Sequence, residues 1–289
     1  MAETDPSKRV FPRARDDAET ARHQSVSPQT QDPAYQLAFQ DMDFLLREDL
    51  RPVRFQLELL KPQLLLDEAE IASTLVFYGS ARIPETVHAD ALVDAAATDR
   101  QRLIAERLRA KAKYYDEARA LARIASRVPR NAQGLREFVV CSGGGPSIME
   151  AANRGAADEG AESIGLNIVL PHEALPNPYV TPSLSFQFHY FALRKMHFLL
   201  RARAVAVFPG GFGTFDECFE LLTLIQTGKV KPLPILFFGR EFWERVVNFE
   251  ALVEEGVISE RDLKLFRFVE TAEEAWRHLC DEDVAERLA

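Results

Sequence analysis

The chain has 289 residues, 47% of them hydrophobic, and a formal net charge of −9. That length and apolar content suffice for one substantial core, or for a core with a smaller appendage. The acidic balance argues against broad binding to nucleic acid, which depends on clustered Lys and Arg. No segment approaches the roughly 20 continuous apolar residues that cross a bilayer, and the three cysteines form no CxxC pair. We therefore expect a soluble cytoplasmic protein that binds a small molecule, with no nucleic acid and no membrane among its partners.

The first 72 residues are predicted to lie outside the main domain. Residues 1–33 mix charges with Ser, Gln and Pro and have almost no apolar periodicity, which predicts a flexible tail. Residues 34–72 have a helical apolar pattern that is expected to be interrupted at Pro52 and Pro62. We interpret this stretch as a helical arm that caps the main domain or contacts a second copy.

The main domain, residues 73–289, is predicted to alternate strands with helices. The run TLVFYGSAR from Thr74 is typical of a buried strand that ends in a Gly-Ser turn. One long helix is expected over 98–126, where apolar residues recur at helical spacing and should pack on a sheet face. The segments EFVVCSGGGPSIMEAANRGAADEG and SIGLNIVL then predict a strand, a glycine turn, a helix and another strand.

The same alternation continues to the C-terminus after the Pro-rich loop LPHEALPNPYVTPS. The segment SFQFHYFALRKMHFLLRARAVAVFPGGFGTFDECFELLTLIQTGK predicts a strand-like stretch, a helix, a strand, a glycine turn and a long helix. LPILFFGR adds a strand, REFWERVVNFEALVEEG a helix, FRFVE a short strand, and residues 271–288 a terminal helix. The predicted fold class is α/β, with a doubly wound parallel sheet and an N-terminal helical extension. Such sheets bind ligands at the carboxyl ends of their strands.

Two glycine turns lie between a buried strand and a helix. They span Ser142 to Pro146 after FVVC, and Pro209 to Thr214 after AVAVF. Glycine lets the backbone approach a ligand closely, and the helix that follows offers free N–H groups, so each turn suits an anion such as a phosphate. Any strand-to-helix turn favours glycine, but two such turns in one sheet indicate a binding site.

Thr214 and Glu217 have a structural explanation as well as a functional one. They match the S/T-x-x-E form of a capping box, in which each side chain bonds the other residue's backbone. A helix that needs only a cap does not need the three glycines ahead of these residues. They favour the functional explanation, in which the Glu217 carboxylate lies one helical turn from a bound phosphate. Arg194 and Lys195, on the preceding helix, are the candidate cations for the same site.

The aromatic residues and histidines around Arg194 are interpreted as packing residues. A histidine among Phe and Tyr side chains is more often packed or exposed than a proton carrier, so His189 and His197 stay outside the candidate site. We interpret four phenylalanines as core residues or contacts with a second copy, in preference to a platform on which a base stacks. They are Phe186, Phe188, Phe191 and Phe198.

The order of a YGS turn, a GGGP turn, the pair Arg194-Lys195 and the motif PGGxGTxxE resembles the Lonely Guy family of phosphoribohydrolases, often labelled "lysine decarboxylase". The resemblance covers the chain from Thr74 onwards, and the N-terminal arm resembles that of the longer bacterial members. It implies a Rossmann-like homodimer or higher homo-oligomer. Such an enzyme cleaves a nucleoside 5′-monophosphate, for example AMP or a cytokinin nucleotide, to free base and ribose 5-phosphate, with no metal and no cofactor.

The resemblance also implies roles for individual residues. Asp216 departs from the Glu that plant members usually have, and Pro-Ser-Ile-Met-Glu follows the GGG; both departures leave base specificity open. The family's catalytic arginine falls on Arg194 and its catalytic glutamate on Glu217. Its substrate-binding positions fall on Lys195, Gly210, Gly211, Gly213, Thr214 and Thr223, and less specifically on Ser80, Gly143, Gly144 and Gly145.

These residue types suit the implied chemistry. Breaking a ribosyl C–N bond develops oxocarbenium character at the anomeric carbon. Glu217 can stabilise that positive charge, attack the carbon, or orient a water molecule. Arg194 offers a planar fork of donors that can hold the carboxylate or a ribose hydroxyl. A phosphate held by the PGGFGT turn would supply binding energy that positions the sugar.

Two other functions are weighed against this one. A non-catalytic nucleotide or molybdenum-cofactor carrier of the same superfamily would use the glycine turns but would not need Arg194 and Glu217. Literal lysine decarboxylase activity would need pyridoxal phosphate on a Schiff-base lysine, and nothing in the sequence resembles that arrangement.

Overall fold

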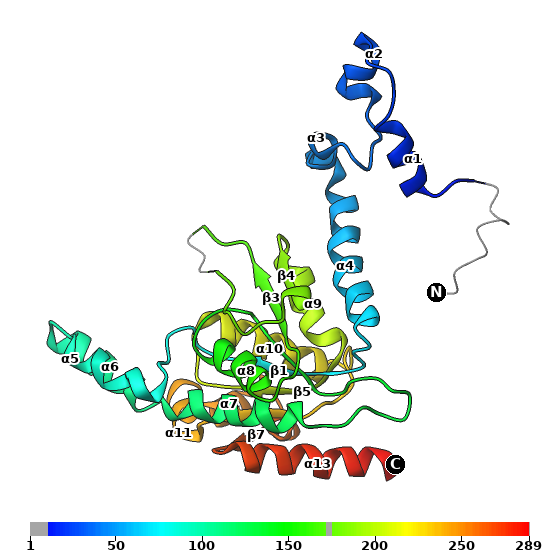
Figure 1. The fold of residues 1–289 in the computed structure, drawn as a ribbon. Helices are drawn as coiled ribbons and strands as arrows, with labels where there is room; N and C mark the ends of the chain where they lie inside the picture. Colours follow the sequence, from blue (N-terminus) through cyan, green and yellow to red (C-terminus); the bar gives the residue numbers. More distant parts are fainter. Residues whose placement is uncertain (1–10, 172–174, 289) are drawn as a thin grey trace. The chain divides into compact units, whose positions relative to one another are not determined.

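The computed structural model describes residues 11–171 and 175–288, and the chain forms two compact units, Met1–Leu57 and Glu58–Ala289. The N-terminal unit contains short helices that begin at side-chain caps: Ser27 accepts a hydrogen bond from Thr30 N, and Asp41 accepts one from Phe44 N. Residues 1–10 of the predicted tail lie outside the described residues, and the division into tail and arm stays a prediction. The helices are α1 (Ala14–Ala21), α2 (Pro28–Gln31), η2 (Pro33–Tyr35), α3 (Met42–Leu45), η3 (Glu48–Leu50) and the first residues of α4 (Arg51–Glu68) (Figure 1).

Proline does not interrupt α4, contrary to the sequence-based expectation. The helix runs through Pro62, which has no N–H to donate to the Glu58 carbonyl one turn earlier. His197 Nε2 lies 3.2 Å from that carbonyl oxygen and takes the place of the missing donor. Burial lowers the pKa of His197, which favours the neutral ring. His197 is therefore a packed residue that satisfies the backbone of α4.

The second unit is built on a seven-stranded parallel sheet in the order β4-β3-β2-β1-β5-β6-β7. From β1 the chain adds strands outward in one direction, and from β5 it adds them outward in the other. The topological switch point therefore lies between β1 and β5, and the predicted doubly wound, Rossmann-like α/β fold is confirmed. The strands are β1 (Thr74–Tyr78), β2 (Val139–Ser142), β3 (Ile164–Ile168), β4 (Ser185–Phe188), β5 (Ala202–Val207), β6 (Ile235–Phe238) and β7 (Arg267–Val269).

Helices cover both faces of this sheet. Alternate strand residues such as Leu75 and Phe77 pack in one core with α7 (Lys113–Ser126), α8 (Ile148–Asp158) and α13 (Ala272–Leu288) (Figure 1). The intervening residues face the other way, where Tyr78 meets α9 and Phe237 meets α11 and α12. These helices are α9 (Phe191–Leu200), α10 (Phe212–Gln226), α11 (Arg240–Val246) and α12 (Phe249–Glu254), and the remaining 3-10 turns are η4 (Thr86–His88), η5 (Pro182–Leu184) and η6 (Glu260–Leu265).

The long helix expected over 98–126 is wrong as a single element. The chain forms α5 (Ala89–Asp94), α6 (Asp99–Arg109) and α7, with a turn between α6 and α7. The residues at that turn carry no Gly or Pro, so the local sequence does not signal it. Tyr114 and Tyr115 are buried against the sheet, whereas Ile104 on α6 is exposed. Burial of the two tyrosines redirects the chain.

The helix predicted for REFWERVVNFEALVEEG likewise divides into α11 and α12. Asn248 caps the second of these by accepting a hydrogen bond from Ala251 N at 3.1 Å. In the part of the chain that the structure describes, no helix has both the length and the apolar character needed to span a bilayer.

Candidate active site

The turns after β1 and β5 are joined at the switch point of the sheet. Ser80 N donates to Pro209 O at 3.1 Å, and Phe208 N donates to Tyr78 O at 2.8 Å. A cleft of about 900 Å³ opens beside this junction. Its lining residues come from the turn after β1, from α8, from the end of β3 and the loop after it, from α9, from the first half of α10 and from the end of α11. They are Gly79, Ser80, Ala81, Arg82, Met149, Ile168, Leu170, Phe191, Arg194, Gly211, Phe212, Gly213, Thr214, Phe215, Glu217 and Val246.

Arg194 and Glu217 form an ion pair in the wall of the cleft. Arg194 Nη1 donates to Glu217 Oε1 at 2.8 Å, and the two side chains are only 11% and 13% exposed. Arg194 Nε donates to Leu166 O at 2.7 Å, and the guanidinium lies over the Phe198 ring, 4.9 Å from its centroid. The arginine is therefore held on three sides while its carboxylate partner stays at the cleft surface.

The environment of Glu217 perturbs the ionisation of its carboxyl group. Burial raises the pKa of this carboxyl above its ordinary value, and the Arg194 charge opposes that effect. Burial also raises the pKa of the Tyr78 phenol, and the negative charge of Glu217 adds to the rise. A carboxylate with a perturbed pKa, paired with an arginine and exposed to a cleft, is a typical candidate for catalysis.

The capping-box explanation of Thr214 and Glu217 is wrong. α10 begins at Phe212, and its N-cap is Gly211, which places Thr214 inside the first turn. Glu217 lies a further turn along and bonds Arg194, not the N-cap backbone. The orientation of the Glu217 carboxylate is thus set by α9, and helix capping does not explain it.

Each glycine turn contains positions where a side chain would not fit. A Cβ on Gly210 would lie 2.1 Å from Thr214 Oγ1, and one on Gly143 would lie 2.8 Å from Arg194 Nη2. Gly144 has φ +73°, and its Cβ would lie 2.4 Å from Asn167 Oδ1. The turn after β2 therefore packs directly against Arg194.

Gly144→Ala should destabilise the protein, because the new methyl would clash with buried Asn167 in a backbone conformation that L-residues avoid. We expect the free energy of unfolding to fall by about 2 kcal/mol or more, measured in urea. Gly211→Ala is the control, since Gly211 has φ −104° and its Cβ would meet no atom within 4 Å. Equal destabilisation by the two variants would contradict the strain assigned to Gly144.

The structure separates two predicted binding residues from the cleft. Lys195 Nζ lies 2.8 Å from Asp216 Oδ1 and 3.0 Å from Glu220 Oε2, so it ties α9 to α10. Thr223 is exposed, and its hydroxyl donates to Phe219 O at 2.8 Å near the far end of α10. Ser80, Gly211, Gly213 and Thr214 border the cleft, whereas Gly210 and the turn Gly143–Gly145 are not among its lining residues.

Several lining residues were not predicted from the sequence. Arg82 is one of them, although its position two residues after Ser80 in the same turn was a usable signal. Phe191 is half exposed and lines the cleft, unlike Phe186, Phe188 and Phe198, which are buried as expected. Phe212 stands at the cleft with 96% of its surface exposed. The cleft therefore combines the Arg194–Glu217 pair and Arg82 with a largely apolar, aromatic wall.

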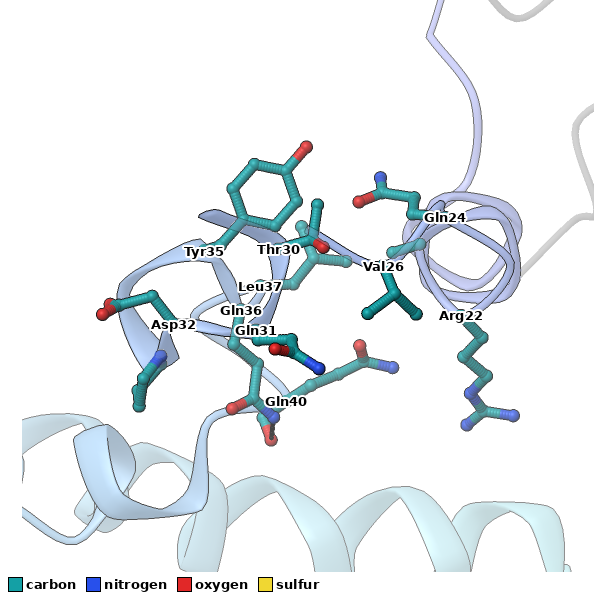
Figure 2. Close-up of a pocket in the computed structure, with 12 residues that line it drawn as sticks. Arg22, Gln24, Val26, Thr30, Gln31, Asp32, Tyr35, Gln36, Leu37 and Gln40 are labelled. Carbon is teal, nitrogen blue, oxygen red and sulfur yellow. Dashed lines mark hydrogen bonds between the residues drawn. The ribbon is translucent and has the colours of Figure 1, made fainter. Parts of the chain in front are cut away.

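A second cavity, of about 550 Å³, lies within the N-terminal unit. Figure 2 shows that glutamine side chains such as Gln31 and Gln40 surround it, with the charged residues Arg22 and Asp32 on opposite sides. Its lining offers amides and aliphatic groups, not a paired acid and base. The Arg194–Glu217 cleft is therefore the better candidate for chemistry.

A family comparison matches the part of the chain that supplies Arg194 and Glu217. A family model described as "Possible lysine decarboxylase" matches residues 149–279, which include Arg194, Lys195 and the PGGFGT turn. A pyrimidine/purine nucleotide 5′-monophosphate nucleosidase of Escherichia coli K12 is 32% identical over 120 residues, or 38% of this chain. That match spans only 26% of the length of the E. coli enzyme.

A cytokinin riboside 5′-monophosphate phosphoribohydrolase of Arabidopsis thaliana is 28% identical over 153 residues, which cover 52% of this chain and 67% of the plant enzyme. Among solved structures, a molybdenum cofactor binding protein from Rippkaea orientalis is 15% identical, with a TM-score of 0.42 over 76% of this chain and 98% of that chain. The curated relatives named here act on nucleoside 5′-monophosphates.

Proposed function

Because the resemblance of this chain to the Lonely Guy family is confirmed by the family model and by curated relatives, we propose that the protein hydrolyses the N-glycosidic bond of nucleoside 5′-monophosphates. The observation that carries this proposal is the Arg194–Glu217 ion pair, largely buried yet bordering the cleft at the switch point. The products would be a free base and ribose 5-phosphate. Assembly as a homo-oligomer and a cytoplasmic location stay predictions.

The proposed reaction assigns a role to each side of the cleft. The 5′-phosphate binds at the PGGFGT turn, where Gly211, Gly213 and Thr214 line the cleft at the N-terminus of α10. Glu217 faces the ribose and stabilises the positive charge that develops at C1′ as the C–N bond breaks. Water then adds to C1′, and a proton passes to the departing base. Arg194 holds the carboxylate in place through Nη1, because its own position is fixed by Leu166 O.

Incubation with AMP, GMP, IMP, CMP, UMP and isopentenyladenosine monophosphate tests this proposal. Release of base and of ribose 5-phosphate in equal amounts, measured by chromatography, is the expected result for at least one member. If every member binds but none is cleaved, the hydrolase proposal is wrong and the protein is a nucleotide-binding protein.

AMP should be cleaved far more efficiently than adenosine. The phosphate contributes binding energy at the start of α10 that positions the ribose against Glu217, and adenosine lacks it. We expect kcat/KM for AMP to exceed that for adenosine by about a hundredfold or more, since truncated substrates lose kcat as well as affinity. Adenosine supplemented with inorganic phosphate is the control. Comparable kcat/KM values for AMP and adenosine would contradict the phosphate site.

A further inference from the structure

The charges that line the cleft do not balance. Of the lining residues, only Arg82, Arg194 and Glu217 carry full charges at neutral pH. Arg194 and Glu217 form an ion pair at 2.8 Å and neutralise each other. Lys195, which follows Arg194 in sequence, is paired with Asp216 and Glu220. Among the described lining residues, one unneutralised positive charge therefore remains, and it belongs to Arg82.

Arg82 has no ion pair and no aromatic partner for its guanidinium in the described residues. It lies in the turn that follows β1, and its backbone is held there because Arg82 N donates to Ser80 Oγ at 3.0 Å. Ser80 N in turn donates to Pro209 O, which immediately precedes the glycines of the PGGFGT turn. Two short links therefore connect the backbone at Arg82 to the turn that begins α10.

Resting on the function proposed above, we infer that Arg82 is a specificity-determining residue that binds the 5′-phosphate from the turn after β1, where it lines the cleft. A phosphate monoester carries close to two negative charges at pH 7. Neutral N–H groups at the start of α10 cannot balance that charge, whereas a free guanidinium can bond two phosphate oxygens at once. Arg82 thereby supplies selectivity for phosphorylated ligands, and Glu217 with Arg194 supplies the chemistry.

Arg82→Gln tests this assignment, with Arg100→Gln, an exposed arginine on α6 outside the cleft, as the matched control. We expect Arg82→Gln to raise KM for AMP by about tenfold or more while kcat changes by less than about threefold, because it removes a charge-assisted bond made in ground and transition states alike. Arg82→Lys should recover part of the affinity, and Arg100→Gln should behave as the wild type. An unchanged KM in Arg82→Gln would overturn the assignment and leave the proposed hydrolase function intact.

A binding measurement keeps the two proposals distinguishable. Calorimetric titration with ribose 5-phosphate, compared with ribose, requires no turnover. Weaker binding of ribose 5-phosphate to Arg82→Gln than to the wild type and Arg100→Gln would support the role of Arg82 even if no nucleotide were cleaved. Equal binding by all three proteins, or none by the wild type, would overturn it.

Discussion

Replacing Glu217 by Gln should lower kcat for nucleoside 5′-monophosphates by about a hundredfold or more, in line with the loss of a group that stabilises transition-state charge. Gln keeps the size of the side chain and an oxygen that can accept from Arg194 Nη1, so nucleotide binding and most of the thermal stability should persist. Single-turnover kinetics, together with the melting temperature, separates loss of chemistry from loss of fold.

Asp216→Asn is the matched control for Glu217→Gln, since it removes the neighbouring carboxylate, which is exposed and bonded to Lys195. This variant should keep near-normal turnover. If Glu217→Gln retained activity and Asp216→Asn lost it, the catalytic carboxylate would be Asp216 and the proposed mechanism would be wrong.

The pH dependence gives a second measure of the same residue. The active form of Glu217 is the carboxylate, so kcat/KM should rise with pH as this group loses its proton. An ordinary glutamate has a pKa of about 4.3. Because burial raises the pKa of Glu217, the acid limb of kcat/KM should lie at higher pH than that value. Asp216→Asn should keep this limb, and Glu217→Gln should remove it from the residual activity.

Arg194→Ala should also lower kcat by about a hundredfold or more, because it frees the carboxylate that the guanidinium holds at 2.8 Å. The pKa of Glu217 should rise further, since the opposing positive charge is lost, so the acid limb should move to higher pH. Some loss of stability is expected, because Leu166 O also loses its donor. Stopped-time assays across a pH series measure both effects.

Two further variants define how Arg194 acts. Arg194→Lys keeps the charge but not the fork that bonds Leu166 O and Glu217 together, so it should recover only part of the activity. The double variant Arg194→Ala with Glu217→Gln should lose much less than the product of the two single losses, as expected for residues that work as a unit. Losses that multiply fully would show that the two residues act independently.

The alternation of strands, turns and helices could be predicted from the sequence because its signals are local. A buried parallel strand such as Thr74–Tyr78 is a continuous apolar run, and the two glycine turns, after Cys141 and after Val207, each lie just before a helix start. The same locality explains the errors. Nothing in the residues between Arg109 and Lys113 indicates a turn. The helix also runs through Pro62, where His197, distant in sequence, occupies the Glu58 carbonyl.

The sequence by itself determined the fold class and the residue types of the site. Each glycine turn, and the motif PGGxGTxxE that contains the second one, is an unbroken stretch of the chain and can be recognised locally. Only the tertiary structure decided which of those residues meet. Arg194 and Lys195 are neighbours in sequence, but successive residues on a helix point about 100° apart, so one faces Glu217 and the cleft while the other faces Asp216 and Glu220. Arg82 enters the cleft because β1 and β5 are adjacent in the sheet, a long-range pairing that no local pattern encodes.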